Sequence, residues 1–241
     1  MRFDRRSQCY ERYADVQRSL VDWGVSMLPS SLAGRKVLEF GAGTGLLTRA
    51  LVDRGAAVRA TDAAGAMVEE GRRRVPRASW EIRDAWSPGK GALQANGTFD
   101  WVASSALLQW APDPEAVLRE WRHHVGPDGK ILALLFAEPT LPELCQLVPE
   151  AIPLTWRSPE EWVRMCEAAG WRVSEHAAEE RIIIHANAHA LLRSLHGTGA
   201  TVAPRLSPAK LRRVLKTYDA RWSDSSGDVR ATWTFLRLLA V

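Results

Sequence analysis

The sequence predicts an α/β fold with a doubly wound, mostly parallel sheet of seven strands, a helical insertion or cap, and an antiparallel C-terminal strand. Five β/α units occupy residues 35–137, where short aliphatic or β-branched runs alternate with amphipathic helical patterns. The run ILALLFA at 131–137 is apolar throughout, as expected for a central strand buried on both faces. A glycine-rich turn at 41–45 follows the first run, where a Rossmann-like sheet joins its first strand to its first helix.

Local signals mark where the helices of this region begin and end. Segment 44–55 has its leucines on one helical stripe and closes on Gly55, which suits a C-cap. Segment 65–75 has its arginines in the last turn, where cations complement the helix dipole. Segment 113–125 starts with Asp-Pro, an N-cap followed by the residue favoured at the first helical position. Strands are expected around these helices at 35–40, 56–62, 78–85, 99–108 and 130–137.

The second half of the chain departs from this alternation. Apolar runs at 180–186 and 229–241 predict two more strands. Between them, Leu211, Val214 and Tyr218 recur at helical spacing. Helices are expected at 142–148, 158–170, 187–195 and 207–218. We therefore divide the chain into an N-terminal helical lid at 1–34 and a main domain at 35–241, with helical insertions at about 140–170 and 187–220.

Composition limits the class of protein. The chain has 241 residues, of which 46% are hydrophobic and 25% charged, which suits one large globular domain. No apolar run approaches the roughly 20 residues that a bilayer crossing needs, and the N-terminus lacks a signal-peptide core. Three cysteines stand far apart, outside metal-ligand or redox spacing. We expect a cytoplasmic protein with reduced thiols and without a metal or membrane partner.

The charge balance favours an acidic partner without identifying it. The formal net charge is +4 and the sequence pI is about 9.2. Basic residues are dispersed along the chain. We therefore expect no nucleic-acid partner.

The glycine-rich turn predicts a nucleotide-like ligand. Gly41, Gly43 and Gly45 run as G-x-G-x-G, and a backbone without side chains lets N–H groups and the helix N-terminus approach a ligand. Dinucleotide-binding turns instead run as G-x-G-x-x-G, where the helix meets a pyrophosphate. Glu39 beside the turn would repel a pyrophosphate but suits a ligand with an ammonium group and no phosphate. S-adenosylmethionine is such a ligand, and a turn needed only for packing is the alternative.

Two further acids stand at the ends of the next strands. Asp62 ends the second strand about 20 residues after the turn, where an acid accepts hydrogen bonds from both ribose hydroxyls. Asp84 closes the third strand and is placed to contact the amino edge of an adenine. Because the carboxyl ends of parallel strands meet at one edge of the sheet, the three acids are expected on one rim.

The blocks VLEFGAGTG, ATDAAGAM, RDA, FDWVASSALLQW and VGPDGKILA, in this order, resemble those of the class I S-adenosylmethionine-dependent methyltransferases over residues 35–137. The resemblance implies that the turn and Glu39 hold the methionine moiety and that Asp62 holds the ribose. It also implies that Ala63 and Met67 form the adenine wall. The full set of implied cofactor-binding residues is Glu39, Gly41, Gly43, Gly45, Asp62, Ala63, Met67, Asp84, Ala85 and Ser104.

Segments outside these blocks indicate which class of molecule accepts the methyl group. The N-terminal FDRRSQCYERYADVQ, with SSALLQW, TLPEL and SLHGTGAT, is similar to the malonyl-acyl-carrier-protein O-methyltransferases of biotin synthesis over nearly the whole chain. The resemblance implies methylation of the free carboxylate of a malonyl thioester on an acidic acyl-carrier protein. Relatives of this layout also methylate free acids such as trans-aconitate, or quinone precursors. Both alternatives stay open, as does a nucleotide-binding module without methyl transfer.

A carboxylate acceptor requires little chemical activation by the protein. It is already ionised at neutral pH and needs no general base, and the stretch SSALLQW offers none. Catalysis then comes from in-line alignment of the reacting atoms. We nominate Tyr10, Gln109 and Trp110 as catalytic pocket residues, with the N-terminal segment acting as a lid. For Tyr10 the alternative is an ordinary contact of an amphipathic helix.

Two further features each carry an ordinary structural alternative. His196, beside Gly197, is either a site residue or a turn histidine without a ligand role. The helix expected at 207–218 either docks an acidic carrier protein or presents an ordinary solvated face. Its basic residues, largely off the apolar stripe, are Lys210, Arg212, Arg213 and Lys216.

Overall fold

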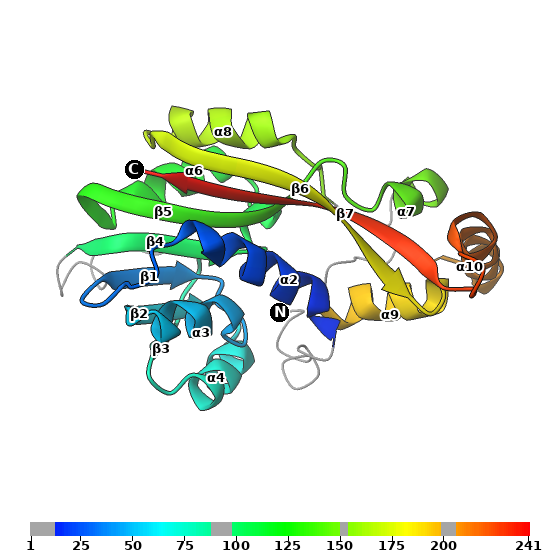
Figure 1. Cartoon of the computed structure of the whole chain (residues 1–241), viewed down its shortest axis with the longest axis horizontal. Coiled ribbons are helices and arrows are strands. Elements are labelled where there is room, and N and C mark those ends of the chain that lie inside the picture. The colour runs from blue at the N-terminus through cyan, green and yellow to red at the C-terminus, as the bar shows by residue number, and fades with distance from the viewer. Residues whose placement is uncertain (1–12, 88–97, 150–153, 199–205) are drawn as a thin grey trace.

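The computed structural model describes residues 13–87, 98–149, 154–198 and 206–241. Its strands are β1 (Lys36–Phe40), β2 (Ala57–Asp62), β3 (Ser79–Ile82), β4 (Phe99–Ser105), β5 (Val125–Ala137), β6 (Val173–His185) and β7 (Val229–Ala240). The predicted fold class is confirmed, because these strands form a seven-stranded sheet in the order β3-β2-β1-β4-β5-β7-β6 (Figure 1). β1 to β5 pair in parallel, and β7 runs antiparallel to both β5 and β6.

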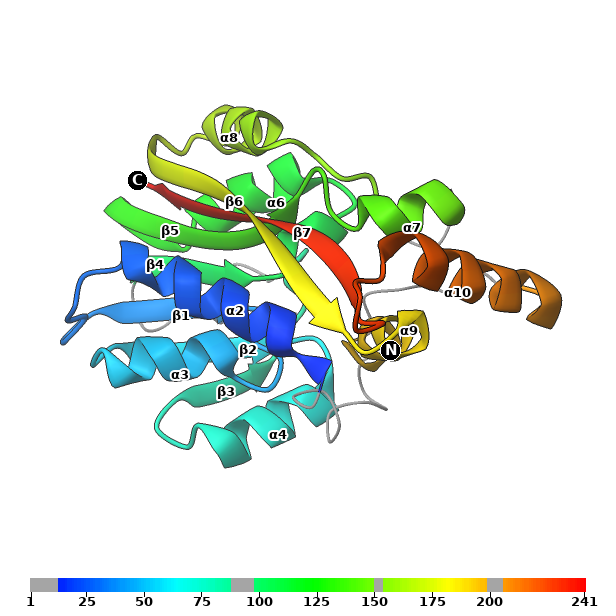
Figure 2. The same cartoon turned by 45° about the vertical axis from the view of Figure 1, so that its right-hand side comes forward.

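Helices cover both faces of this sheet. They are α2 (Asp15–Gly24), η1 (Val25–Met27), α3 (Leu46–Asp53), α4 (Gly65–Arg74), η2 (Leu108–Trp110), α6 (Pro114–Arg122), α7 (Pro142–Leu147), α8 (Pro159–Ala168), α9 (Ala188–Thr198) and α10 (Pro208–Trp222). α2 and α3 pack on one face and α6 and α8 on the other, while α7, α9 and α10 gather at one end of β6 and β7 (Figures 1 and 2).

The central strand β5 is apolar along its run because both of its faces are buried. Leu132, Leu134 and Phe136 face the core under α2 and α3. Ile131 and Leu135 face the second core, under α6 and α8. Successive side chains of a strand point to opposite faces, so a strand covered on both faces must be apolar at every position.

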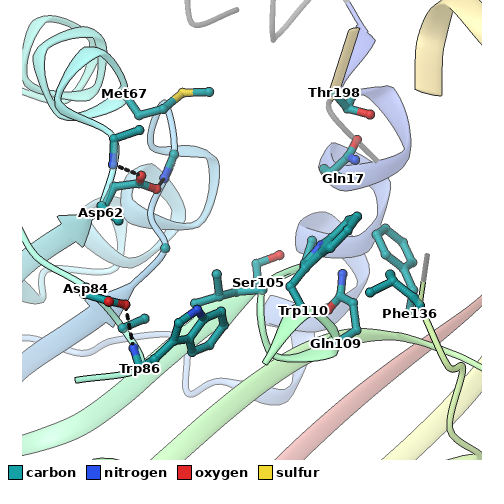
Figure 3. A pocket seen from close by; sticks show the side chains of 18 of the residues that line it. Gln17, Asp62, Met67, Asp84, Trp86, Ser105, Gln109, Trp110, Phe136 and Thr198 are labelled. Atoms are coloured by element: carbon teal, nitrogen blue, oxygen red, sulfur yellow. Dashed lines mark hydrogen bonds between the residues drawn. The ribbon is translucent and has the colours of Figure 1, made fainter. Parts of the chain in front are cut away.

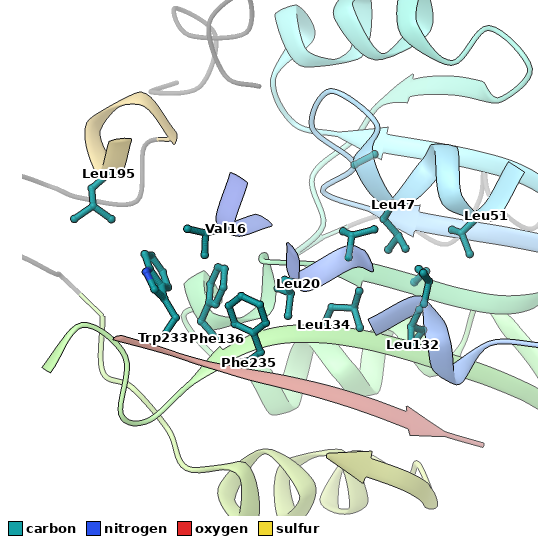
Figure 4. Packing of buried hydrophobic residues seen from close by; sticks show 14 of the residues in the cluster. Val16, Leu20, Leu47, Leu51, Leu132, Leu134, Phe136, Leu195, Trp233 and Phe235 are labelled. Carbon is teal, nitrogen blue, oxygen red and sulfur yellow. The ribbon is translucent and has the colours of Figure 1, made fainter. Parts of the chain in front are cut away.

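The larger core joins the N-terminal helix to the C-terminal strand. Figure 4 shows Val16 and Leu20 of α2 beside Phe136 of β5 and Phe235 of β7. Arg237 of β7 also places its guanidinium 4.5 Å from the ring centroid of Trp23, at the end of α2. The first described helix is therefore anchored on the sheet through apolar packing. The role of residues 1–34 as a lid stays a prediction.

Helix ends follow the signals in the sequence. The Asp113 side chain accepts a hydrogen bond of 3.0 Å from the N–H of Ala116, which confirms the expected N-cap of α6. Gly55 follows α3 with φ +89°, a left-handed conformation that favours glycine. Ser158 and Glu161 form a reciprocal capping box at the start of α8.

Two strands begin earlier than the sequence indicates. β5 starts at Val125, because the expected turn GPDG bulges out of the strand while Phe99 pairs with Val125 and Trp101 with Lys130. β6 starts at Val173 rather than 180, since its first half pairs with β7 although its side chains are polar and mostly exposed. An edge strand with a solvated face has no apolar run to reveal it.

In the part of the chain that the structure describes, no helix is long and apolar enough to cross a membrane. Cys166 is buried, and burial raises the pKa of its thiol to about 12. Cys9 lies outside the described residues.

Candidate active site

A cavity of about 400 Å³ opens at the carboxyl ends of the parallel strands, where ligands bind in sheets of this kind. Figure 3 shows that it has two sides. Asp62, Met67, Asp84 and Trp86 lie on one side, here called the cofactor side. Ser105 lies between this side and the other, here called the acceptor side. The acceptor side is lined by Gln17, Gln109, Trp110, Phe136, Leu141, Leu154, Trp156, Thr198 and Trp233.

The glycine-rich turn forms part of the cofactor side. Gly41 and Gly43 line the cavity and have φ of +66° and +54°, in the left-handed region that glycine tolerates. A Cβ on Gly43 would meet no atom within 4 Å, so this backbone is open to the cavity. Gly45 caps α3 instead, and a Cβ there would come within 3.3 Å of Val75 and Trp80. The prediction that Gly45 contacts the cofactor stays untested, because it does not line the cavity.

Asp62 is held by the turn that it faces. One carboxylate oxygen accepts the N–H of Gly43 at 2.9 Å, and the other accepts the N–H of Ala64 at 2.9 Å. A carboxylate oxygen accepts more than one hydrogen bond, so Asp62 is able to receive two ribose hydroxyls as well. Ala63 and Met67 line the cavity next to it. These three predicted cofactor residues are brought together by the end of β2 and the start of α4.

Asp84 lies across the cofactor side from Met67 (Figure 3). It accepts the N–H of Trp86 at 2.9 Å, which fixes the turn after β3. Ala85 is buried and also lines the cavity. Its carbonyl accepts the indole N–H of Trp121 at 2.9 Å, so the core under α6 supports this wall.

Two predicted cofactor residues lie beneath the cavity wall. Glu39 is 1% exposed, and its carboxyl accepts the hydroxyl of Thr48 at 2.6 Å. Burial, with a smaller contribution from the neighbouring Asp62 charge, raises the pKa of Glu39 to about 8 against the lowering effect of the hydrogen bond from Thr48. Glu39 is therefore mostly protonated at pH 7 in the protein without ligand. Ser104 is fully buried, whereas the adjacent Ser105 lines the cavity.

The acceptor side contains two of the three nominated catalytic residues. Gln109 and Trp110 lie on η2, directly after β4, and both line the cavity. Tyr10 lies outside the described residues. Tyr13 packs on Gly197 of α9 and receives a hydrogen bond of 3.4 Å from Ser194, so the start of α2 is joined to the end of α9.

Several acceptor-side residues escaped the sequence reasoning. They come from α2, the end of β5, the segment before α8, the end of α9 and β7: Gln17, Phe136, Trp156, Thr198 and Trp233. Only the high tryptophan count hinted at them, because large rings are expected in cores or pocket walls. His196 lies within α9 rather than in a turn, and it does not line the cavity.

The lining residues fit S-adenosylmethionine. Two carboxylates and a bare glycine backbone suit ribose hydroxyls, an adenine amino edge and an ammonium group. Among the residues that the structure describes, no Lys, Arg or His lines the cavity, so a pyrophosphate would face acids without a compensating cation. Fold and site together define a Rossmann-like protein whose cavity suits an adenosyl ligand without a phosphate.

Comparison with known proteins identifies the family. A family model described as a methyltransferase domain matches residues 10–202. The chain is similar to the malonyl-acyl-carrier-protein O-methyltransferase of Halorhodospira halophila, with 31% identity over 96% of this chain and 82% of that protein. The chain belongs to the methyltransferase-domain family, and it is an S-adenosylmethionine-dependent O-methyltransferase.

Solved structures share the fold at low sequence identity. A methyltransferase structure from Bacillus halodurans has a TM-score of 0.67 at 12% identity, covering 93% of this chain and 97% of that one. Phosphoethanolamine N-methyltransferase 2 of Haemonchus contortus, in complex with S-adenosyl-L-methionine, has a TM-score of 0.58 at 16% identity, covering 98% of this chain and 57% of that one.

Gly43→Ala is expected to leave the protein folded but to weaken S-adenosylhomocysteine binding at least tenfold, because the new methyl enters open cavity space. Gly34→Ala is the matched control, since Gly34 also has positive φ and open space around its Cβ but lies away from the cavity. Titration calorimetry measures both affinities. Equal affinities in the two variants would show that the ligand does not approach Gly43.

Proposed function

We propose that this protein methylates the free carboxylate of a malonyl thioester on an acidic acyl-carrier protein and so forms a methyl ester in early biotin synthesis. The name of the relative at 31% identity supports the substrate. The chemistry of the acceptor side supports it independently. This side is aromatic and amide-rich, and none of its described residues is a general base at neutral pH. That observation carries the proposal, because a carboxylate is an acceptor that arrives already ionised.

The cofactor supplies an electrophilic methyl group on a sulfonium sulfur. Asp62, Asp84 and the glycine-rich turn would hold the adenosyl part and fix its orientation. Trp110, Phe136 and the other acceptor-side rings would exclude water around the incoming carboxylate. In the transfer, a carboxylate oxygen bonds to the methyl carbon while the carbon–sulfur bond breaks, and its electron pair stays on sulfur. No proton moves, so the residues act by alignment and desolvation.

Intact-mass measurement tests the substrate directly. Wild-type protein, S-adenosylmethionine and malonyl carrier protein are expected to give one added methyl on the thioester-bound group, with hydrolysis of the thioester releasing monomethyl malonate. Acetyl carrier protein, which has no carboxylate, should gain none. Transfer to free trans-aconitate or to a quinone precursor, with none to malonyl carrier protein, would favour the alternative of another small acceptor.

The helix α10 offers a docking surface for the acidic partner. Arg212, Arg213 and Lys216 are exposed, while Val214 and Tyr218 are buried toward the core. α10 contacts α7 and α9, and the residues Leu141 and Thr198 at the ends of these two helices line the acceptor side. A cationic rim beside the acceptor side would speed and orient carrier-protein docking.

Reversing both charges in the Arg212→Glu/Arg213→Glu variant is expected to raise KM for malonyl carrier protein about tenfold at low salt and less at high salt. Affinity for S-adenosylhomocysteine should not change. The matched control reverses Arg164 and Arg172, which are exposed on and after α8. Steady-state kinetics at two ionic strengths measure the effect. Equal KM in both double variants would rule out docking on α10.

A further inference from the structure

Buried polar atoms without hydrogen-bond partners gather on the acceptor side and on the adjoining Ser105. Within the described residues they include side-chain oxygens of Gln17, Ser105 and Gln109 and the indole nitrogens of Trp156 and Trp233. Buried polar groups in folded proteins are nearly always paired, so a cluster of unpaired ones on residues that line one cavity indicates a polar ligand group.

The tryptophans differ in whether the indole N–H has a hydrogen-bond partner. The indole N–H groups of Trp80, Trp121 and Trp171 each donate to a backbone carbonyl, at 3.1, 2.9 and 2.9 Å. Trp156 and Trp233 have no such partner, although Trp233 is only 2% exposed. Three core indoles are thus satisfied, whereas the indoles of the two cavity-lining tryptophans stay unsatisfied, as does that of Trp162 in the second core.

Both tryptophans lie on segments whose backbone pairs with the end of β5. Trp233 precedes Thr234, which pairs with Ala137 in the β5–β7 register. Trp156 precedes Arg157, whose carbonyl accepts the N–H of Glu138, the residue after β5. The ring of Trp233 lies 4.8 Å from that of Phe136, measured between centroids (Figure 4). Two segments far apart in the sequence thus bring Trp156 and Trp233 to one strand end.

We infer that the indole N–H groups of Trp156 and Trp233 bind the acceptor carboxylate, with the side-chain NH2 groups of Gln17 and Gln109 as neighbouring donors; the amide oxygens of these glutamines are acceptors and take no part. The inference rests on the proposed carboxylate acceptor. An indole N–H is a donor only, so it selects an acceptor-only group such as an ionised carboxylate. Bonds to an ionised acceptor are shorter and roughly twice as strong as neutral ones.

Uncharged donors suit this reaction better than an ion pair. A guanidinium on the carboxylate would withdraw electron density from the attacking oxygen and repel the sulfonium. After transfer it would remain buried without a counter-charge, whereas an indole loses only a hydrogen bond. The neutral ester is a weaker acceptor than the carboxylate, so these donors hold substrate more tightly than product.

The test compares acid and ester in variants that remove only an N–H donor and part of a ring. Trp156→Phe and Trp233→Phe are each expected to raise KM for malonyl carrier protein at least tenfold, with an unchanged Kd for S-adenosylhomocysteine. Trp162→Phe is the matched control, because the Trp162 indole also lacks a partner but lies in the second core, away from the cavity. Its KM should equal that of the wild type.

Competition by the product separates recognition from packing. Wild-type protein should bind malonyl-pantetheine at least tenfold more tightly than its methyl ester, and the Trp156→Phe/Trp233→Phe variant should bind both alike. If the double variant bound the acid and the ester with affinities reduced by the same factor, the rings would act by packing alone, which would overturn the inference. So would an unchanged KM in both single variants.

The outcome is separable from that of the proposed function. If wild-type protein transfers methyl to malonyl carrier protein but the variants keep their acid preference, the inference fails and the function stands. If wild-type protein instead methylates free di- or tricarboxylic acids, the same variants are assayed on those acids, where loss of acid preference supports the inference. Methylation of no carboxylate at all overturns both.

Discussion

Asp62→Ala is expected to lower affinity for S-adenosylmethionine at least 100-fold. The substitution removes the group placed to receive two ribose hydroxyls, and hydrogen bonds to a charged acceptor contribute about 1.5–3 kcal/mol each. It also releases the N–H groups of Gly43 and Ala64, which Asp62 accepts at 2.9 Å each. The turn that faces the cofactor would then lose its fixed shape.

Titration calorimetry with S-adenosylhomocysteine measures this loss. Asp53→Ala is the control, since Asp53 is an exposed acid at the end of α3 that pairs with Arg77. Asp62→Asn separates the two contributions, because an amide keeps one oxygen acceptor of similar position. Affinity within threefold of wild type in Asp62→Ala would contradict the assignment of the ribose to this residue.

Glu39→Gln is expected to stabilise the protein above neutral pH. Burial raises the pKa of Glu39 to about 8, whereas in the unfolded chain the pKa lies near the ordinary glutamate value of 4.5. Between these two values the folded state binds more protons than the unfolded state, so wild-type stability falls as pH rises through this range and levels off above pH 8. Glutamine is uncharged at every pH and still offers an oxygen to Thr48.

The free energy of unfolding, measured with urea at several pH values, gives the comparison. Wild type and Glu39→Gln should differ little at pH 4.5, and the variant should exceed wild type by on the order of 3–5 kcal/mol at pH 9. Thr48→Val, which removes the hydroxyl that bonds Glu39 at 2.6 Å, should destabilise the protein at all these pH values. A pH-independent difference between wild type and Glu39→Gln would show that Glu39 does not titrate in this range.

The sheet was predictable because its signals are local. The apolar run of β5 and the apolar stripes of the neighbouring helices predict from local sequence alone which side chains are buried. Asp113 caps α6 as expected. The early starts of β5 and β6 were not predictable in the same way. A bulged turn inside a paired strand and a polar edge strand both depend on a partner strand far away in the sequence.

The candidate site likewise contains residues that local sequence predicts and residues that only the fold brings together. The glycine-rich turn, Asp62 and Asp84 stand at or just after the carboxyl ends of strands, so parallel-sheet geometry alone places them on one rim. Gln17 and Trp233 reach the acceptor side from near opposite ends of the chain, which no spacing rule anticipates. Glu39 matched a motif position, but only the fold shows that its side chain is buried against Thr48.

A crystal structure with bound S-adenosylhomocysteine tests the site most directly. We expect its ribose hydroxyls within hydrogen-bond distance of Asp62, its adenine between Met67 and Asp84, and its sulfur facing Ser105 and Trp110. A ligand bound elsewhere, or one whose sulfur points away from the aromatic rings of the acceptor side, would contradict the division of this cavity into cofactor and acceptor sides.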